Sequence, residues 1–109
     1  IEGAHDLLIS KQVNSAFYGT PDLDSWLKQE DINAITICGI TTNHCCETTA
    51  RMAGNLGYDV TFVLDATHCN DKKDIEGNVI PAAEISRITG ANLNGEFATV
   101  RSTAAVLAS

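Results

Sequence analysis

Apolar runs alternate along the chain with segments in which apolar residues recur three or four positions apart. Short apolar runs are typical of strands, and a spacing of three to four is typical of helices. One run, residues 34–40 (AITICGI), has the continuous apolar character of a fully buried strand in a parallel sheet. Further strands are predicted at Asp6–Ser10 (DLLIS), Tyr58–Leu64 (YDVTFVL) and Phe97–Arg101 (FATVR).

Three helices are predicted from helical spacing bounded by start or stop signals. In the first, Thr20-Pro21 supplies an N-cap and a first-turn proline. In the second, Thr42 or Asn43 can cap the start, and Gly57 ends the helix. The predicted helices cover residues 21–30, Cys45–Leu56 and Pro81–Ile88, and residues 67–78 are predicted to form a polar loop.

This alternation implies parallel strands joined by crossover helices. We therefore expect an α/β fold, a Rossmann-like parallel sheet flanked by helices in three α/β/α layers. Ligands bind outside the carboxyl ends of the strands in such sheets. Lys11, Cys45 and Asp65 all follow predicted strand ends, so they should share one edge of the sheet.

Composition narrows the class of protein. The 109 residues suit a single domain, and 44% apolar with 19% charged residues excludes a disordered chain. A net charge of −7 argues against a nucleic-acid partner, because little could neutralise a run of phosphates. No stretch has the length and apolarity of a membrane span, and no signal peptide is recognisable. The four cysteines fit free thiols in a reducing cytoplasm better than a disulfide framework.

Cys45 is the first candidate for chemistry because it stands where a buried strand gives way to a helix. The backbone N–H groups and the dipole at a helix N-terminus favour the thiolate, the nucleophilic form of cysteine. The alternative is a small buried hydrophobic residue, the commonest role of a cysteine. We expect Cys46, about 100° round the helix, and Cys38 to be core residues, and Cys69 to be an exposed thiol.

Lys11 and Asp65 are candidate site residues because we expect them at the same sheet edge as Cys45. An ammonium group beside the thiol would stabilise the thiolate and charge on a substrate oxygen; the alternative is an ordinary surface lysine. For Asp65 we favour a helix cap or a hydrogen-bonding anchor of the following loop. The histidine and cysteines at residues 44–46, and those at residues 68–69, are consecutive in the sequence. Zinc ligands are usually separated by two to four residues, so we predict no metal and no cofactor.

Residues 39–67 (GITTNHCCETTARMAGNLGYDVTFVLDAT) resemble the signature of the isochorismatase-like cysteine hydrolases, which include nicotinamidases and N-carbamoyl amide hydrolases. Residues 11–20 (KQVNSAFYGT), with Leu23 and Leu27, resemble the lysine segment of that family, and residues 91–106 resemble its usual ending. The similarity extends over essentially the whole chain and is specific.

The resemblance implies a Cys-Lys-Asp triad in which Cys45 is the nucleophile and Lys11 is the lysine. In relatives, two backbone N–H groups beside a cis peptide without proline form the oxyanion hole. Here that bond would be Ile40–Thr41, with the amides of Thr41 and Cys45 as donors. Walls of the substrate pocket are predicted from residues close to these positions in the sequence: Phe17, Tyr18 and His44.

The third triad member departs from the family pattern. The family's aspartate follows the first strand, whereas only Glu2 and Asp6 precede Lys11, and neither follows an apolar strand. We therefore expect residues 1–109 to form a single partial domain whose N-terminal strand or strands are missing. The first strand is central in the order 3-2-1-4-5-6, so its loss would leave an unpaired edge that invites another chain.

These residues predict a cysteine hydrolase that cleaves an amide-type C–N bond of a small molecule through a thioester at Cys45. The alternative is a non-catalytic interaction or assembly fragment, because the triad aspartate is absent. A redox role for Cys45 and Cys46 ranks last, since adjacent cysteines form a strained ring and no CxxC spacing is present. We expect pairing with a second copy or with the missing N-terminal portion, and neither a nucleic-acid nor a membrane partner.

Overall fold

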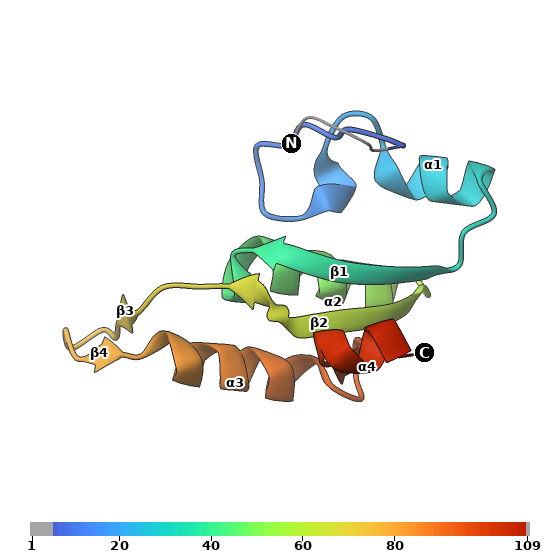
Figure 1. Cartoon of the computed structure of the whole chain (residues 1–109). Coiled ribbons are helices and arrows are strands. Elements are labelled where there is room, and N and C mark those ends of the chain that lie inside the picture. Colours follow the sequence, from blue (N-terminus) through green and yellow to red (C-terminus); the bar gives the residue numbers. More distant parts are fainter. Residues whose placement is uncertain (1–5, 109) are drawn as a thin grey trace.

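The structure is a computed structural model that describes residues 6–108 (Figure 1). The strands are β1 (Ala34–Ile40), β2 (Asp59–His68), β3 (Lys72–Lys73), β4 (Val79–Ile80) and β5 (Thr99–Arg101). The helices are α1 (Leu23–Gln29), α2 (Glu47–Asn55), α3 (Ala82–Leu93) and α4 (Thr103–Ala108). A 3₁₀ turn, η1 (Ala16–Tyr18), lies before α1, and a π-helical turn, η2 (Thr42–Cys46), lies between β1 and α2.

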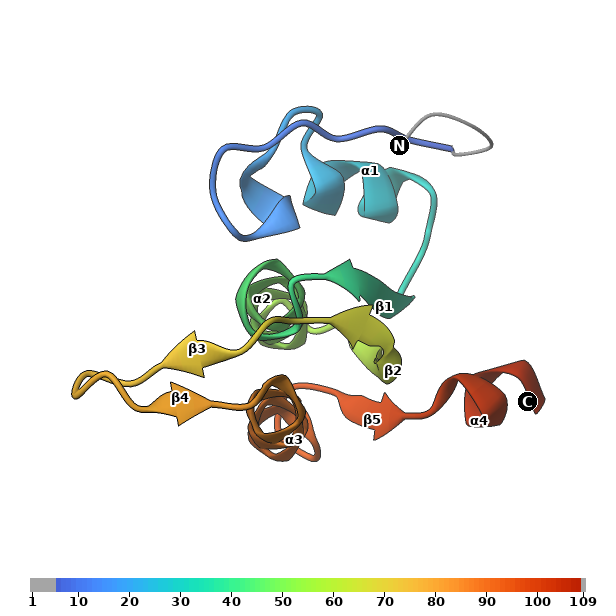
Figure 2. The same cartoon turned by 60° about the vertical axis from the view of Figure 1, so that its left-hand side comes forward.

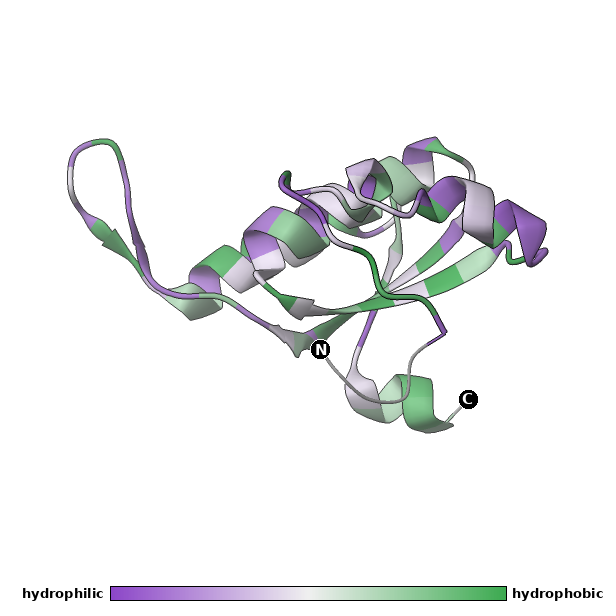
Figure 3. Cartoon of the chain, turned by 90° about the horizontal axis from the view of Figure 1, so that it is seen from above, coloured by the Kyte–Doolittle hydropathy of each residue, from purple (hydrophilic) through white to green (hydrophobic). Residues whose placement is uncertain are grey.

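Three parallel strands form the main sheet, in the order β1-β2-β5. Ala34 pairs with Asp59 and Thr61 pairs with Thr99, so the carboxyl ends of the strands face the same way. Helices α2 and α3 lie on one face of the sheet and α4 lies on the other (Figures 2 and 3). The predicted α/β class, a parallel sheet flanked by helices, is confirmed.

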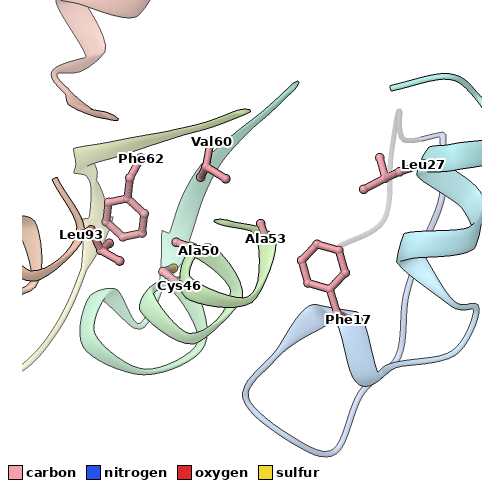
Figure 4. Packing of buried hydrophobic residues seen from close by; sticks show 8 residues of the cluster. All are labelled: Phe17, Leu27, Cys46, Ala50, Ala53, Val60, Phe62 and Leu93. Atoms are coloured by element: carbon pink, nitrogen blue, oxygen red, sulfur yellow. The ribbon is translucent and has the colours of Figure 1, made fainter. Parts of the chain in front are cut away.

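The centre of the core lies between the sheet and α2 (Figure 4). Phe62 of β2 and Leu93 of α3 are fully buried. Cys46 and Ala50 face them from η2 and α2, and these small side chains let the helix approach the sheet closely. The prediction that Cys46 is a core residue is therefore confirmed.

The segment before β1 joins the same core through Phe17 and Leu27, both buried near Ala53 (Figure 4). Asp22 caps α1, because its carboxylate accepts a hydrogen bond from the Ser25 amide at 3.0 Å. Thr20, the predicted cap, instead forms a backbone bridge with Ser10.

Strand β1 has the predicted bounds but is not fully buried. Its side chains alternate between half-buried and exposed positions, Cys38 is exposed, and Ile40 is 69% exposed. The prediction that Cys38 is a core residue is wrong. The physical reason is that β1 lies at an edge of the described sheet, while α4, the helix on its outer face, packs against β2.

Other differences lie outside the central strands. In the described chain, residues 6–10 form no strand; Ser10 makes one antiparallel bridge with Thr20, because this segment lies beside η1 and α1 and away from β1 (Figures 1 and 2). Strand β2 and helix α3 extend beyond their predicted ends, and α4 was not predicted. The expected polar loop contains β3, which pairs with β4 as a hairpin that projects from the body (Figure 3).

Cys69, expected to be exposed, is 7% exposed, and its Sγ lies 3.4 Å from the carbonyl oxygen of Ala82. The loop folds back beside the start of α3, which covers the thiol, so that prediction is wrong. Glu2 lies outside the described residues. None of the helices between residues 6 and 108 has the length and apolarity needed to cross a membrane.

Candidate active site

Cys45 lies in the turn that joins the carboxyl end of β1 to α2, and it is partly buried. The Ile40–Thr41 peptide bond, which leads into this turn, is cis, as the resemblance implied. The carbonyl oxygen of Thr41 accepts hydrogen bonds from the amides of His44 and Cys46, both at 3.1 Å. The amide of Cys45 is not one of its donors. That Thr41 and Cys45 donate to a substrate oxygen stays a prediction.

The structure brings Lys11 and Cys45 together across 34 positions of sequence. The Lys11 Nζ atom lies 3.2 Å from the Cys45 Sγ atom and also donates to the carbonyl oxygen of Val13 at 3.0 Å. An ammonium group at this distance stabilises a thiolate relative to a neutral thiol. The Oδ1 atom of Asn14 lies 3.8 Å from the same sulfur.

The position of Lys11 depends on a backbone bridge and a close approach. Ser10 and Thr20 exchange two backbone hydrogen bonds of 2.9 and 2.8 Å beside the lysine. Gly19 has no room for a side chain, since a Cβ there would lie 2.8 Å from the Ser10 carbonyl oxygen. The absence of a Cβ therefore allows the two segments to meet.

A second anchor ties this segment to α2. The Ala16 amide donates to the Thr49 hydroxyl at 3.0 Å, and the Phe17 amide donates to the Ser15 hydroxyl at 3.1 Å. The ring of Phe17 is 5% exposed and stacks on Tyr58 with centroids 5.9 Å apart. Phe17 thus belongs to the core, and it also lines a hollow together with Tyr18. That Phe17 contacts a substrate stays a prediction.

The two adjacent cysteines have different environments. Burial of Cys46 raises the pKa of its thiol to about 11, with the neighbouring Cys45 as a smaller cause. Cys46 is therefore a neutral thiol at physiological pH, and Cys45 is the member of the pair that contacts a cation. All four cysteines of the chain are free, so the structure offers no support for a redox pair.

Asp65 anchors another segment by hydrogen bonds, as we favoured from the sequence. The anchored segment is the start of α4 and not the loop that directly follows Asp65. Its Oδ1 atom accepts hydrogen bonds from the Thr103 amide at 2.7 Å and hydroxyl at 2.8 Å, at the start of α4. The hydroxyl and then the amide lower the pKa of Asp65. In the part of the chain that the structure describes, no carboxylate forms an ion pair with Lys11.

Two open hollows lie beside these residues. The first, of about 410 Å³, is lined by Lys11 and Tyr18, which is exposed. The second, of about 330 Å³, is lined by residues of the turn after β1 and of the segment after β2: Thr41, Asn43, His44, Asn70, Asp71 and Lys72. Cys45 itself lines neither hollow: Tyr18 shares the first with Lys11, and His44, which borders the second, directly precedes Cys45 in the turn. That Tyr18 and His44 contact a substrate stays a prediction.

Sequence reasoning missed Asn14 and Lys72. Asn14 lies within the segment that resembles the family's lysine motif, so its nearness to Lys11 was the available signal. Lys72 lies in the stretch expected to be a polar loop, and its approach to His44 has no counterpart in sequence spacing. Among residues 6–108, no group of three or more His, Cys, Asp or Glu side chains is arranged to hold a metal ion.

Comparisons with known proteins agree with this architecture. The family model for the isochorismatase domain matches residues 2–84. The isochorismatase family protein YrdC of Bacillus subtilis is 43% identical over 98 residues, which cover 90% of this chain and 52% of YrdC. The crystal structure of a cysteine hydrolase from Pseudomonas syringae pv. phaseolicola matches with a TM-score of 0.89 and 33% identity, covering 99% of this chain and 50% of that one.

A relative with a named reaction is the ureidoacrylate amidohydrolase RutB of Methylorubrum extorquens, 40% identical over 63 residues, or 58% of this chain and 25% of RutB. The chain spans about half the length of the first curated relatives it matches. The matched family model covers most of the chain, and the parallel sheet agrees with the solved structure. The chain therefore belongs to the isochorismatase family, a family of hydrolases.

Proposed function

We propose that this hydrolase acts through Cys45 as a nucleophile on an amide-type C–N bond. The observation that carries the proposal is the 3.2 Å contact between the Lys11 ammonium and the Cys45 sulfur. Two similarities support it: the Pseudomonas relative is a cysteine hydrolase, and RutB is an amidohydrolase. The substrate is a small molecule bound in the open hollows that Lys11 and His44 line, next to Cys45 in the site.

In the proposed reaction, Cys45 Sγ bonds to the carbonyl carbon while the π electrons move to the carbonyl oxygen. The Thr41 and Cys45 amides hold this oxyanion, at about 3 kcal/mol per donor. The C–N bond then breaks, and Lys11, the acid nearest the sulfur, gives its proton to the leaving amine. Water attacks the thioester, its proton returns to Lys11, and cleavage of the C–S bond regenerates the thiolate.

The second half of this cycle lacks a visible base. In the described chain, no carboxylate pairs with Lys11, so nothing besides the lysine itself is placed to activate water. We expect acylation of Cys45 to be faster than hydrolysis of the thioester. The chain spans half of its relatives, and we propose that the remaining half of such a domain supplies the missing carboxylate.

The test is acylation with p-nitrophenyl acetate. We expect a burst of about one equivalent of p-nitrophenol followed by slow turnover, with the acetyl group mapped to Cys45 by mass spectrometry. A Cys45→Ala variant should lose the burst. The matched control is Cys38→Ala, which removes an exposed thiol that is not a hydrogen-bond partner of Lys11 and should retain the burst. Acetylation of Cys38 in preference to Cys45 would contradict the proposal.

The exposed edge of β1 favours a second, compatible role in assembly. Within the described sheet β1 pairs only with β2, and Ile40 is largely exposed. Because the relatives are about twice as long, we propose that this edge pairs with a strand from the other half of an isochorismatase domain. Mixing the chain with the N-terminal half of YrdC should slow amide exchange in β1. Unchanged exchange, or a self-dimer instead of a mixed complex, would contradict the assembly role.

A further inference from the structure

The hollow beside His44 is lined by a lysine, Lys72, that takes no part in the proposed reaction. The Lys72 Nζ atom lies 3.5 Å from the His44 Nε2 atom, although the two residues are 28 positions apart. His44 directly precedes Cys45 in the turn, and Lys72 begins the β3–β4 hairpin, where it pairs with Ile80. A side chain from the hairpin therefore reaches back to the turn that carries the nucleophile.

Lys72 has no anionic partner in the described chain. Its contact is an imidazole nitrogen, and no Asp or Glu oxygen among residues 6–108 pairs with it. Asp71 also lines the hollow, but its Oδ1 atom accepts a 2.8 Å hydrogen bond from the Ala82 amide at the start of α3. Lys72 therefore lines an open hollow and forms no ion pair with a carboxylate among the described residues, so its ammonium group is available to an anion from outside.

The remaining lining of this hollow is polar, and part of it belongs to the turn that carries Cys45. Thr41 follows the cis peptide bond, and Asn43 and His44 belong to the same turn as Cys45. A small molecule with its carbonyl carbon at Cys45 could extend along this turn towards the ammonium group of Lys72. The volume of about 330 Å³ accommodates a side arm of a few non-hydrogen atoms.

We propose that Lys72 and His44 form a carboxylate-binding subsite, which selects amide substrates that carry a carboxylate group. The carboxylate would accept a charge-assisted hydrogen bond from Lys72, while His44 fixes the ammonium group beside the turn. This inference rests on the proposed function, since it assigns the substrate class of the same site. Lys72 is a specificity residue in this view, and Lys11 remains the lysine that contacts the sulfur.

The test compares two thiol reagents of similar shape on the intact chain: N-ethylmaleimide, which is neutral, and 3-maleimidopropanoate, which is anionic. The measured quantity is the ratio of the anionic to the neutral second-order rate constant at Cys45, at neutral pH and low salt. Lys72→Gln should lower this ratio about threefold, the size expected for one partly exposed ion pair. The rate constant for the neutral reagent, measured in the same variant, is the internal reference for this ratio.

Lys73→Gln is the matched control. It removes the same charge from the neighbouring position of the hairpin, where Lys73 pairs with Val79, and should leave the ratio within experimental error. An equal fall in both variants would reveal a general charge effect and overturn the subsite, as would no fall in Lys72→Gln. Failure of the proposed function is separately visible: in the unaltered chain, N-ethylmaleimide would then react with Cys45 no faster than with the exposed Cys38.

Discussion

Replacing Lys11 with glutamine tests the electrostatic basis of the site. The variant removes an ammonium group 3.2 Å from the Cys45 sulfur and leaves a polar side chain of similar length. At that distance, two unit charges attract by about 1.3 kcal/mol in a water-like dielectric. Because Lys11 is exposed, solvent and salt screen the pair, and we take about 1 kcal/mol as its effective energy. Loss of this energy corresponds to about a fivefold fall in the rate constant for reaction at Cys45.

The assay is competitive alkylation with iodoacetamide at neutral pH, with site-specific adducts quantified by mass spectrometry. The Cys45 rate constant should fall about fivefold in Lys11→Gln. Cys38, which is exposed on β1, provides the reference thiol within the same molecule and should keep its rate. Lys73→Gln removes an equal charge from the β3–β4 hairpin and should leave the Cys45 rate unchanged.

Salt adds an independent check. Raising the ionic strength to about 0.5 M should slow alkylation of Cys45 in the unaltered chain and should have little effect in Lys11→Gln. If the Cys45 rate constant is the same in the unaltered chain and in Lys11→Gln at low salt, the ammonium group does not stabilise the thiolate. The nucleophile proposed here would then have no electrostatic support from Lys11.

Three further predictions concern packing and protonation. Gly54→Ala should lower the free energy of unfolding by about 1–3 kcal/mol in urea titrations, because its Cβ would lie 2.7 Å from the Phe97 carbonyl oxygen; a stability equal to that of the unaltered chain would contradict this. Burial and the hydrogen bond to Asp24 raise the pKa of Tyr58 from 10.0 to about 12, so the folded state binds the proton more tightly and stability should fall between those pH values. Tyr58→Phe should lack that part of the fall in urea midpoint, and an identical pH profile would refute the assignment. Cys46, whose pKa is raised to about 11, should remain unalkylated in the folded protein at pH values well below 11, as peptide mapping can show.

The candidate site was predictable because its parts have local signatures. A continuous apolar run followed by helical spacing placed Cys45 at the carboxyl end of a strand, and the structure has that strand at the predicted residues. Lys11 was expected at the same sheet edge because a strand was predicted before it. The structure places Lys11 beside Cys45 by another route, a turn closed by the bridge between Ser10 and Thr20. The resemblance to the family's lysine segment was therefore a better guide than the strand pattern.

The errors share a different physical cause. Exposure of Cys38 and burial of Cys69 depend on which elements cover a segment, and a local apolar pattern does not contain that information. The hairpin of β3 and β4 has strands of two residues, too short for a periodic signal. The contact of Lys72 with His44 follows from the path of this hairpin, so sequence spacing could not predict it.

Cys45 and Lys11 are held by supports of unequal strength. Cys45 lies in the turn between β1 and α2. This turn and the helix contribute the buried side chains of Cys46 and Ala50 to the centre of the core. Lys11 lies on an exposed segment fixed by a short bridge and by the burial of Phe17. Regions with few buried contacts open at lower free energy than the core, so the contact between the two residues should open before the sheet unfolds. Loosening of this segment would therefore remove the ammonium group from the Cys45 sulfur while Cys45 itself stays in place.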